Sequence, residues 1–150
     1  MKLLDLALLI AAMEEARPQA IQVKAIPAKA PGKRTQIKTL DNLSLSRGGS
    51  RYVYSSDKRG TLYEALVIAN SPSFKAILNV DGTPMLNASW SEINAVTQEL
   101  TDITAFQRLE GDYALRISNI SWLKSSYLLI VATDQITINK AVAKYEEETL

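Results

Sequence analysis

The sequence predicts a mainly β protein: an antiparallel sandwich or barrel of short strands, preceded by an N-terminal helix and an extended arm. Three observations predict the β domain. Segments of alternating apolar and polar residues recur, turn residues separate them, and one helix-start pattern lies among them. The length of 150 residues suits one globular domain, and a composition of 47% apolar and 22% charged residues is typical of chains that fold.

Seven segments after residue 50 are predicted as strands, because aliphatic, β-branched and aromatic residues are enriched in them and mostly alternate with polar ones. Asp81-Gly82, between the third and fourth segments, is a strong signal for a two-residue hairpin turn. The predicted strands are residues 51–55, 61–69, 74–80, 85–87, 113–120, 127–133 and 135–145.

One short internal helix is predicted over residues 90–100. Ser89 and Glu92 have the spacing at which each side chain satisfies a free backbone N–H group of the other at a helix start. Ile93 and Val96 then lie on one apolar side.

The beginning of the chain is predicted to form an assembly element. Residues 2–17 place apolar side chains at helical spacing, and this helix packs either on its own domain or on a neighbouring subunit. Residues 19–32 contain Pro27 and Pro31, which do not fit a central strand and favour an extended arm. The predicted domains are residues 1–38, the helix and basic arm, and residues 39–150, the β-sandwich.

Charge is unevenly distributed along the chain. Up to Gly60 there are eleven Lys and Arg residues against five Asp and Glu residues, and after it six against eleven. The basic arm is therefore expected to bind an acidic protein surface. The acidic run at residues 146–148 is expected to be a solvated tail or to meet the arm of a neighbouring subunit. The residues predicted to contact protein partners are Leu3, Leu6, Ile10, Met13, Lys24, Lys29, Lys33, Arg34 and Lys38.

The chain contains no cysteine and no histidine. This excludes disulfides, thiolate or histidine metal sites, cysteine nucleophiles and histidine-based catalytic triads within the chain. The carboxylates are scattered among turns and helix positions, so the sequence predicts neither an acid–base pair nor a calcium loop. We therefore expect a protein that is not an enzyme and that uses no cofactor.

Nucleic acid and membranes are disfavoured as partners. The formal net charge is +1, whereas nucleic-acid-binding domains are usually clearly basic. The one apolar run, from Leu3 to Met13, is interrupted by Asp5 and is shorter than the roughly 20 residues that span a bilayer. A protein made in the cytoplasm is the expectation.

Three stretches carry a family resemblance: Gly60-Thr-Leu-Tyr-Glu-Ala-Leu-Val-Ile-Ala-Asn, Phe74-Lys-Ala-Ile-Leu-Asn-Val-Asp-Gly and Ser89-Trp-Ser-Glu-Ile-Asn. Their layout resembles that of small virion proteins, capsid decoration and tail-associated, of tailed bacteriophages and archaeal viruses. The resemblance covers about residues 60–145 and concerns only the pattern of strands and helix, so no site residue is carried over. It implies a β-sandwich or jelly-roll-like module that assembles on a capsid or tail, and hence a location in the virion, the alternative being a cytoplasmic protein.

A second interpretation is a β-sandwich module that binds carbohydrate or a receptor. Trp90 and Trp122 would then offer flat faces on which sugar rings stack.

Overall fold

The computed structural model describes residues 32–149. The helix expected in residues 2–17 and the arm expected in residues 19–31 lie outside this range. So do six of the predicted interface residues: Leu3, Leu6, Ile10, Met13, Lys24 and Lys29.

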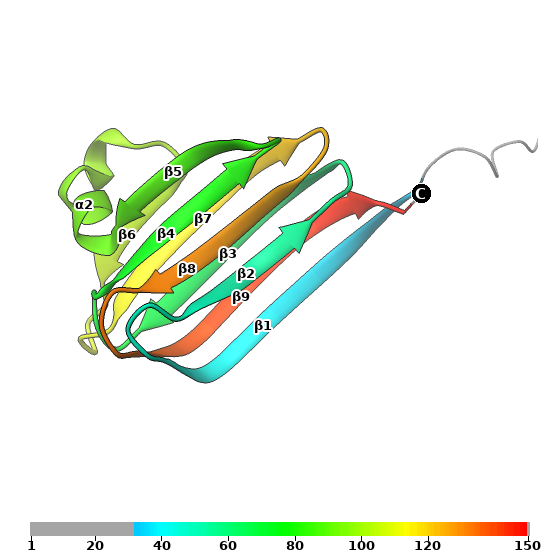
Figure 1. The fold of residues 1–150 in the computed structure, drawn as a ribbon. Coiled ribbons are helices and arrows are strands. Elements are labelled where there is room, and N and C mark those ends of the chain that lie inside the picture. The colour runs from blue at the N-terminus through cyan, green and yellow to red at the C-terminus, as the bar shows by residue number, and fades with distance from the viewer. Residues whose placement is uncertain (1–31, 150) are drawn as a thin grey trace, which may run out of the picture. The chain divides into compact units, whose positions relative to one another are not determined.

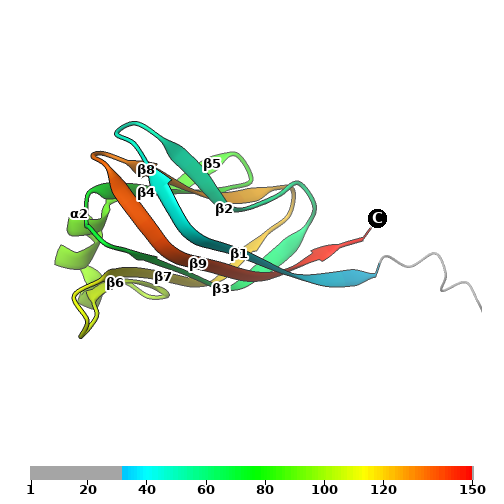
Figure 2. The ribbon, with the colours of Figure 1, turned by 90° about the horizontal axis from the view of Figure 1, so that it is seen from below.

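The described residues form two antiparallel sheets that face each other (Figures 1 and 2). The larger sheet has the strand order β1-β9-β3-β7-β6, and the smaller one has the order β2-β8-β4-β5. The strands are β1 (Lys33–Leu45), β2 (Ser50–Ser56), β3 (Gly60–Ala69), β4 (Phe74–Val80), β5 (Thr83–Ser89), β6 (Ile103–Gln107), β7 (Tyr113–Trp122), β8 (Ser126–Ala132) and β9 (Ile136–Glu148).

The strand pairing is nested. β1 pairs with β9, β2 with β8, β3 with β7 and β4 with β5, and successive pairs alternate between the two sheets. β6 is additional and pairs with β7 at a sheet edge. Nested pairing of this kind, across two sheets, is the jelly-roll arrangement. The predicted fold class, an antiparallel sandwich of jelly-roll type with one short internal helix, is confirmed for the described residues.

One apolar layer fills the space between the sheets. In β8 every second residue is buried, from Ser126 to Ala132, as expected for a strand with one face on the core. Each fully buried large side chain contributes about 1.5–3 kcal/mol to folding. The largest of these side chains on the strands are Leu62, Phe74, Leu78, Leu115, Ile117, Leu128, Ile130, Ile136 and Ile138.

The hairpin between β4 and β5 has the predicted turn. Asp81 and Gly82 are its two central residues, and their φ angles are 52° and 84°. Two consecutive positive φ angles define the turn type that matches the natural twist of a hairpin. This prediction is confirmed.

The internal helix starts where predicted but ends early. In α2 (Trp90–Ala95), the Ser89 hydroxyl accepts from the N–H of Glu92, and the Glu92 carboxylate accepts from the N–H of Ser89. Residue 100 was the expected end, but Val96 leaves the helical conformation with a φ of −118°. The Thr97 hydroxyl bonds to backbone groups of Ile93 and Ala105, and only a short 3₁₀ turn (Thr97–Glu99) follows.

Two strands were not predicted, and both lie at the edges of the larger sheet. β1 shows no clear alternation because most of its side chains are exposed, and β6 has only five residues. The boundary predicted at residue 38 falls within β1. Lys33, Arg34 and Lys38 belong to the sheet, because their backbone pairs with β9.

Candidate functional site: a polar pocket and a free sheet edge

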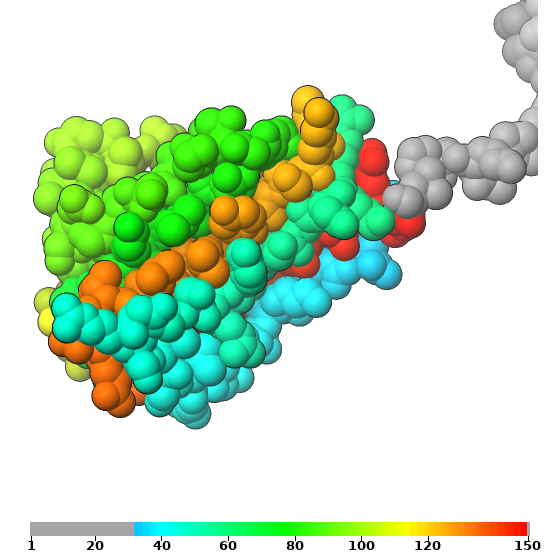
Figure 3. Space-filling view, in the orientation of Figure 1, coloured from blue at the N-terminus to red at the C-terminus, as the bar shows by residue number. Residues whose placement is uncertain are grey.

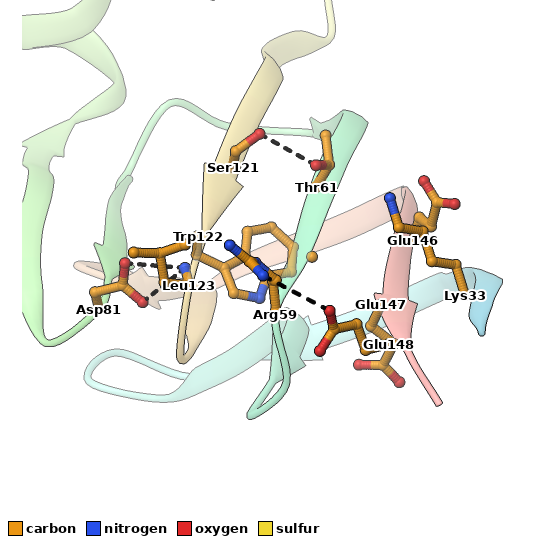
Figure 4. Close-up of a pocket in the computed structure, with 11 residues that line it drawn as sticks. Lys33, Arg59, Thr61, Asp81, Ser121, Trp122, Leu123, Glu146, Glu147 and Glu148 are labelled. Carbon is orange, nitrogen blue, oxygen red and sulfur yellow. Dashed lines mark hydrogen bonds and ion pairs between the residues drawn. The ribbon is translucent and has the colours of Figure 1, made fainter. Parts of the chain in front are cut away.

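A polar pocket of about 400 Å³ lies at one end of the sandwich, where β3 begins and β7 and β9 end (Figure 4). Its wall combines four carboxylates, two basic side chains and the side chains of Trp122 and Leu123. The lining residues are Lys33, Arg59, Gly60, Thr61, Asp81, Ser121, Trp122, Leu123, Glu146, Glu147 and Glu148.

Glu147 is held by three neighbours. Its carboxylate accepts from the Ser56 hydroxyl at 2.6 Å and from the Gln36 amide at 3.2 Å, and the Arg34 guanidinium lies 3.8 Å away. Arg34 and Glu147 are also directly opposite each other in the pairing of β1 with β9. The partners of this carboxylate therefore belong to the sandwich itself.

Glu146 and Glu148 also have partners in the sandwich. Glu146 accepts from the Tyr63 hydroxyl, and this hydrogen bond raises the pKa of Tyr63. Glu148 lies 4.0 Å from Arg59 (Figure 4). The acidic run was expected either as a solvated tail or as a contact for the arm of a neighbouring subunit. It is the end of β9, because this strand extends through Glu148 and pairs there with the basic start of β1 of the same chain.

Asp81 stabilises a loop distant in sequence. Its carboxylate accepts from the backbone N–H groups of Leu123, Lys124 and Ser125 at 2.6–3.1 Å. These hydrogen bonds lower the pKa of Asp81, because they favour its charged form. Sequence reasoning identified only the hairpin role of Asp81, since no local signal connects it to a loop more than 40 residues later.

Three aromatic side chains pack together in the core at this end of the sandwich: Tyr54, Trp122 and Tyr145. Tyr54 stacks on Trp122 with ring centroids 5.7 Å apart, and it lies 5.3 Å from Tyr145. The Tyr54 hydroxyl bonds to Ser126, which donates in turn to the carbonyl of Asn79. A bulge at Val53 turns Tyr54 inward, whereas Tyr52 is 51% exposed.

Neither tryptophan offers a face for stacking a sugar. Trp90 is 7% exposed and donates to the carbonyl of Ala114, and Trp122 is 2% exposed and donates to the carbonyl of Lys58. Both rings are part of the hydrophobic core. The carbohydrate interpretation therefore gains no support from these two residues.

The carboxylates of the pocket stabilise the fold. Each of the four carboxylates is hydrogen-bonded or ion-paired to a neighbour within the sandwich. Among residues 32–149, no group of three or more Asp and Glu side chains is arranged to hold a metal ion. No helix in the described part of the chain is long and apolar enough to cross a membrane.

The outer edge of β1 is the second candidate site. β1 lies at the margin of the larger sheet and pairs only with β9 among the described strands (Figures 1 and 3). Ile37, in the first half of the strand, is 63% exposed. Lys33, Arg34 and Lys38, three of the residues predicted to contact partners, lie on this strand. Sequence reasoning missed Ile37, because a single apolar residue has no periodicity.

No protein-family model and no curated protein sequence matches this chain. The fold and the two candidate sites therefore carry the functional argument.

A substitution at Gly60 tests the close packing beside the pocket. A Cβ atom at this position would lie 2.3 Å from the carbonyl oxygen of Glu146 and 2.8 Å from Cζ2 of Trp122. We expect Gly60→Ala to lower the free energy of unfolding in urea by about 1–3 kcal/mol through overpacking. Gly48→Asn is the control, because its Cβ would meet nothing within 4 Å and asparagine tolerates a positive φ. Equal stabilities of Gly60→Ala and the wild type would contradict this packing.

Because of Tyr54, the free energy of unfolding is expected to fall at alkaline pH. Burial raises the pKa of Tyr54 from 10.0 to about 12. Between pH 10 and about pH 12, the Tyr54 hydroxyl therefore ionises in the unfolded state but keeps its proton in the folded state. The contribution of Tyr54 to the free energy of unfolding is complete below pH 10 and is lost as the pH rises to about 12. A shift of this size corresponds to about 2–3 kcal/mol.

The control for this prediction is Tyr54→Phe, which removes the titrating group and retains the ring. At pH 9 we expect it to be about 1 kcal/mol less stable than the wild type, because a buried hydrogen bond is lost. The difference should shrink and then reverse between pH 10 and 12, as measured by urea unfolding followed by tryptophan fluorescence. Parallel pH profiles of the two proteins would contradict the prediction.

Proposed function

We propose that this protein is a non-catalytic structural subunit that assembles with copies of itself or with other subunits, as a component of a virus particle. The observation that carries the proposal is the outer edge of β1, which pairs with no strand within residues 32–149. A long strand with an unpaired edge is a template for pairing with another chain. Natural sandwiches usually protect such edges by keeping them short, bent or covered.

The jelly-roll strand order supports the viral part of the proposal. This architecture is common in viral capsid domains, although it also occurs in lectins and other proteins. The strand and helix layout that resembles small virion proteins points in the same direction. Fold analogy alone does not assign a function, so the argument for assembly depends on the edge itself.

The pocket supports a structural role over a catalytic one. A general acid or base must be free to exchange a proton with a substrate. The pocket carboxylates instead hold strand ends and a loop in place, as the contacts of Glu147 and Asp81 illustrate. The pocket therefore gives no argument for an enzyme.

The mass of the full-length protein in solution tests the proposal. We expect light scattering to show a discrete oligomer or a larger assembly whose fraction increases with protein concentration. Salt should reduce this fraction to the extent that exposed charges contribute, because ions screen such charges. A strict monomer at every concentration and salt would contradict self-assembly.

A further inference from the structure

We propose that the outer edge of β1 pairs antiparallel with the same strand of a second copy, around a two-fold axis at Ile37. The larger sheets of the two copies then form one continuous sheet. The inference rests on the proposed function and deepens it, because it names the partner strand and its register.

The first nine residues of β1, 33–41, are regular enough to pair. Residues 33–41 follow β9 without interruption, and the pairing skips Asn42, which has a φ of 49°. In a strand, every second residue directs its N–H and C=O groups to the same side. β9 takes one of these two sets, and no described strand takes the other. Ile37 lies at the middle of the regular segment.

The face of β1 that points away from the core is nearly symmetric in sequence about Ile37. Leu40 packs on the core, so alternation places the odd-numbered residues 33–41 on the opposite face. In chain order these residues are Lys33, Thr35, Ile37, Thr39 and Asp41.

A two-fold axis at Ile37 makes every directly opposed pair on this face favourable. Ile37 meets its own copy, Thr35 meets Thr39, and Lys33 meets Asp41. Pairs of β-branched residues and pairs of opposite charge stabilise neighbouring strands. Asp41 already lies 3.2 Å from Lys140 of its own chain, and its second oxygen remains for the lysine of the other copy.

The other face of β1 excludes the neighbouring registers. With the axis at Ile37, Arg34 lies opposite Leu40, and Gln36 lies opposite Lys38. Moving the axis to Gln36 would place Arg34 opposite Lys38, and moving it to Lys38 would place that lysine opposite itself. Like charges directly opposed destabilise a strand pair. Shifting one strand by a single residue relative to the other would place the core face of one copy beside the outer face of the other.

Basic residues and irregular backbone are also devices that protect edges from pairing. Here the irregular residue is Asn42, with a φ of 49°, and it lies just beyond the regular segment. The basic residues Lys33 and Lys38 each face a compatible residue in the register centred on Ile37. The features that would block other registers therefore permit this one.

A single cysteine tests the register directly, because the chain has none of its own. Directly opposed residues of antiparallel strands have Cα atoms about 4.5–5.5 Å apart, within the range of disulfides. We expect full-length Ile37→Cys to form a covalent dimer under mild oxidation. In Thr39→Cys, the two cysteines are offset by roughly 13 Å along the strands, so cross-linking should be at least about tenfold slower. A mixture of Thr35→Cys and Thr39→Cys chains should again cross-link, and only between the two variants.

Charge reversal adds a test of the opposed pair. Lys33→Asp with Ile37→Cys places two carboxylates opposite each other in its homodimer, and Asp41→Lys with Ile37→Cys places two lysines opposite each other. Only the heterodimer of these two variants has opposite charges at both pairs. Random pairing in an equimolar mixture gives equal amounts of heterodimer and homodimers, and we expect the ratio of heterodimer to homodimers to exceed this value by about tenfold. Circular dichroism of each variant checks that the sandwich remains folded.

The outcomes separate this inference from the proposed function. If the wild type assembles but Thr39→Cys cross-links as fast as Ile37→Cys, the register is wrong and self-assembly stands. Random pairing of the charge variants would also overturn the register. If Ile37→Cys fails to fold, the Thr35→Cys and Thr39→Cys mixture decides the same question. A wild-type protein that stays monomeric, with no cross-linking in any variant, would overturn this inference together with the self-assembly part of the proposed function.

Discussion

The central constraint on this sandwich is the position of β9 inside the larger sheet. β9 is the last described strand, yet it pairs with β1 on one side and with β3 on the other. Its alternate residues, including Ile136, Ile138 and Tyr145, fill the core. β1 and β3 belong to the same sheet only because β9, near the end of the chain, lies between them and pairs with both. The nested jelly-roll pairing follows from this position, and so does the place of β1 at the margin of the sheet, where its outer edge pairs with no strand of the described range.

The polar end of the sandwich depends on the same strand. Since β9 extends through Glu148, it brings three consecutive glutamates beside Arg34, Arg59 and Tyr63, whose side chains partner them. Asp81 closes the other side by holding the loop after β7. The result is a pocket whose four carboxylates are each bonded to a neighbour within the sandwich, so their arrangement is explained by the fold.

Local signals in the sequence predicted much of the fold. The Asp81-Gly82 turn and the Ser89–Glu92 cap depend on neighbouring residues and were correct in detail. β1 and β6 were missed because an edge strand exposes side chains that an inner strand would bury, which removes the alternation. The pocket was missed because its contacts join residues far apart in the chain. The charge pattern did select Lys33, Arg34 and Lys38, but the near symmetry about Ile37 has meaning only once residues 33–41 are known to form an edge strand.

β9 occupies one edge of β1, and our central proposal is that assembly uses the other edge. Hydrogen exchange of the backbone amides of residues 33–41, compared between dilute and concentrated full-length protein, tests it most directly. In dilute protein, the amides that face β9 should be protected and the alternate ones should exchange freely. In concentrated protein, both sets should be protected, because the second edge is then paired. An alternating pattern that stays unchanged in an assembled sample would contradict the claim, since assembly would then use another surface.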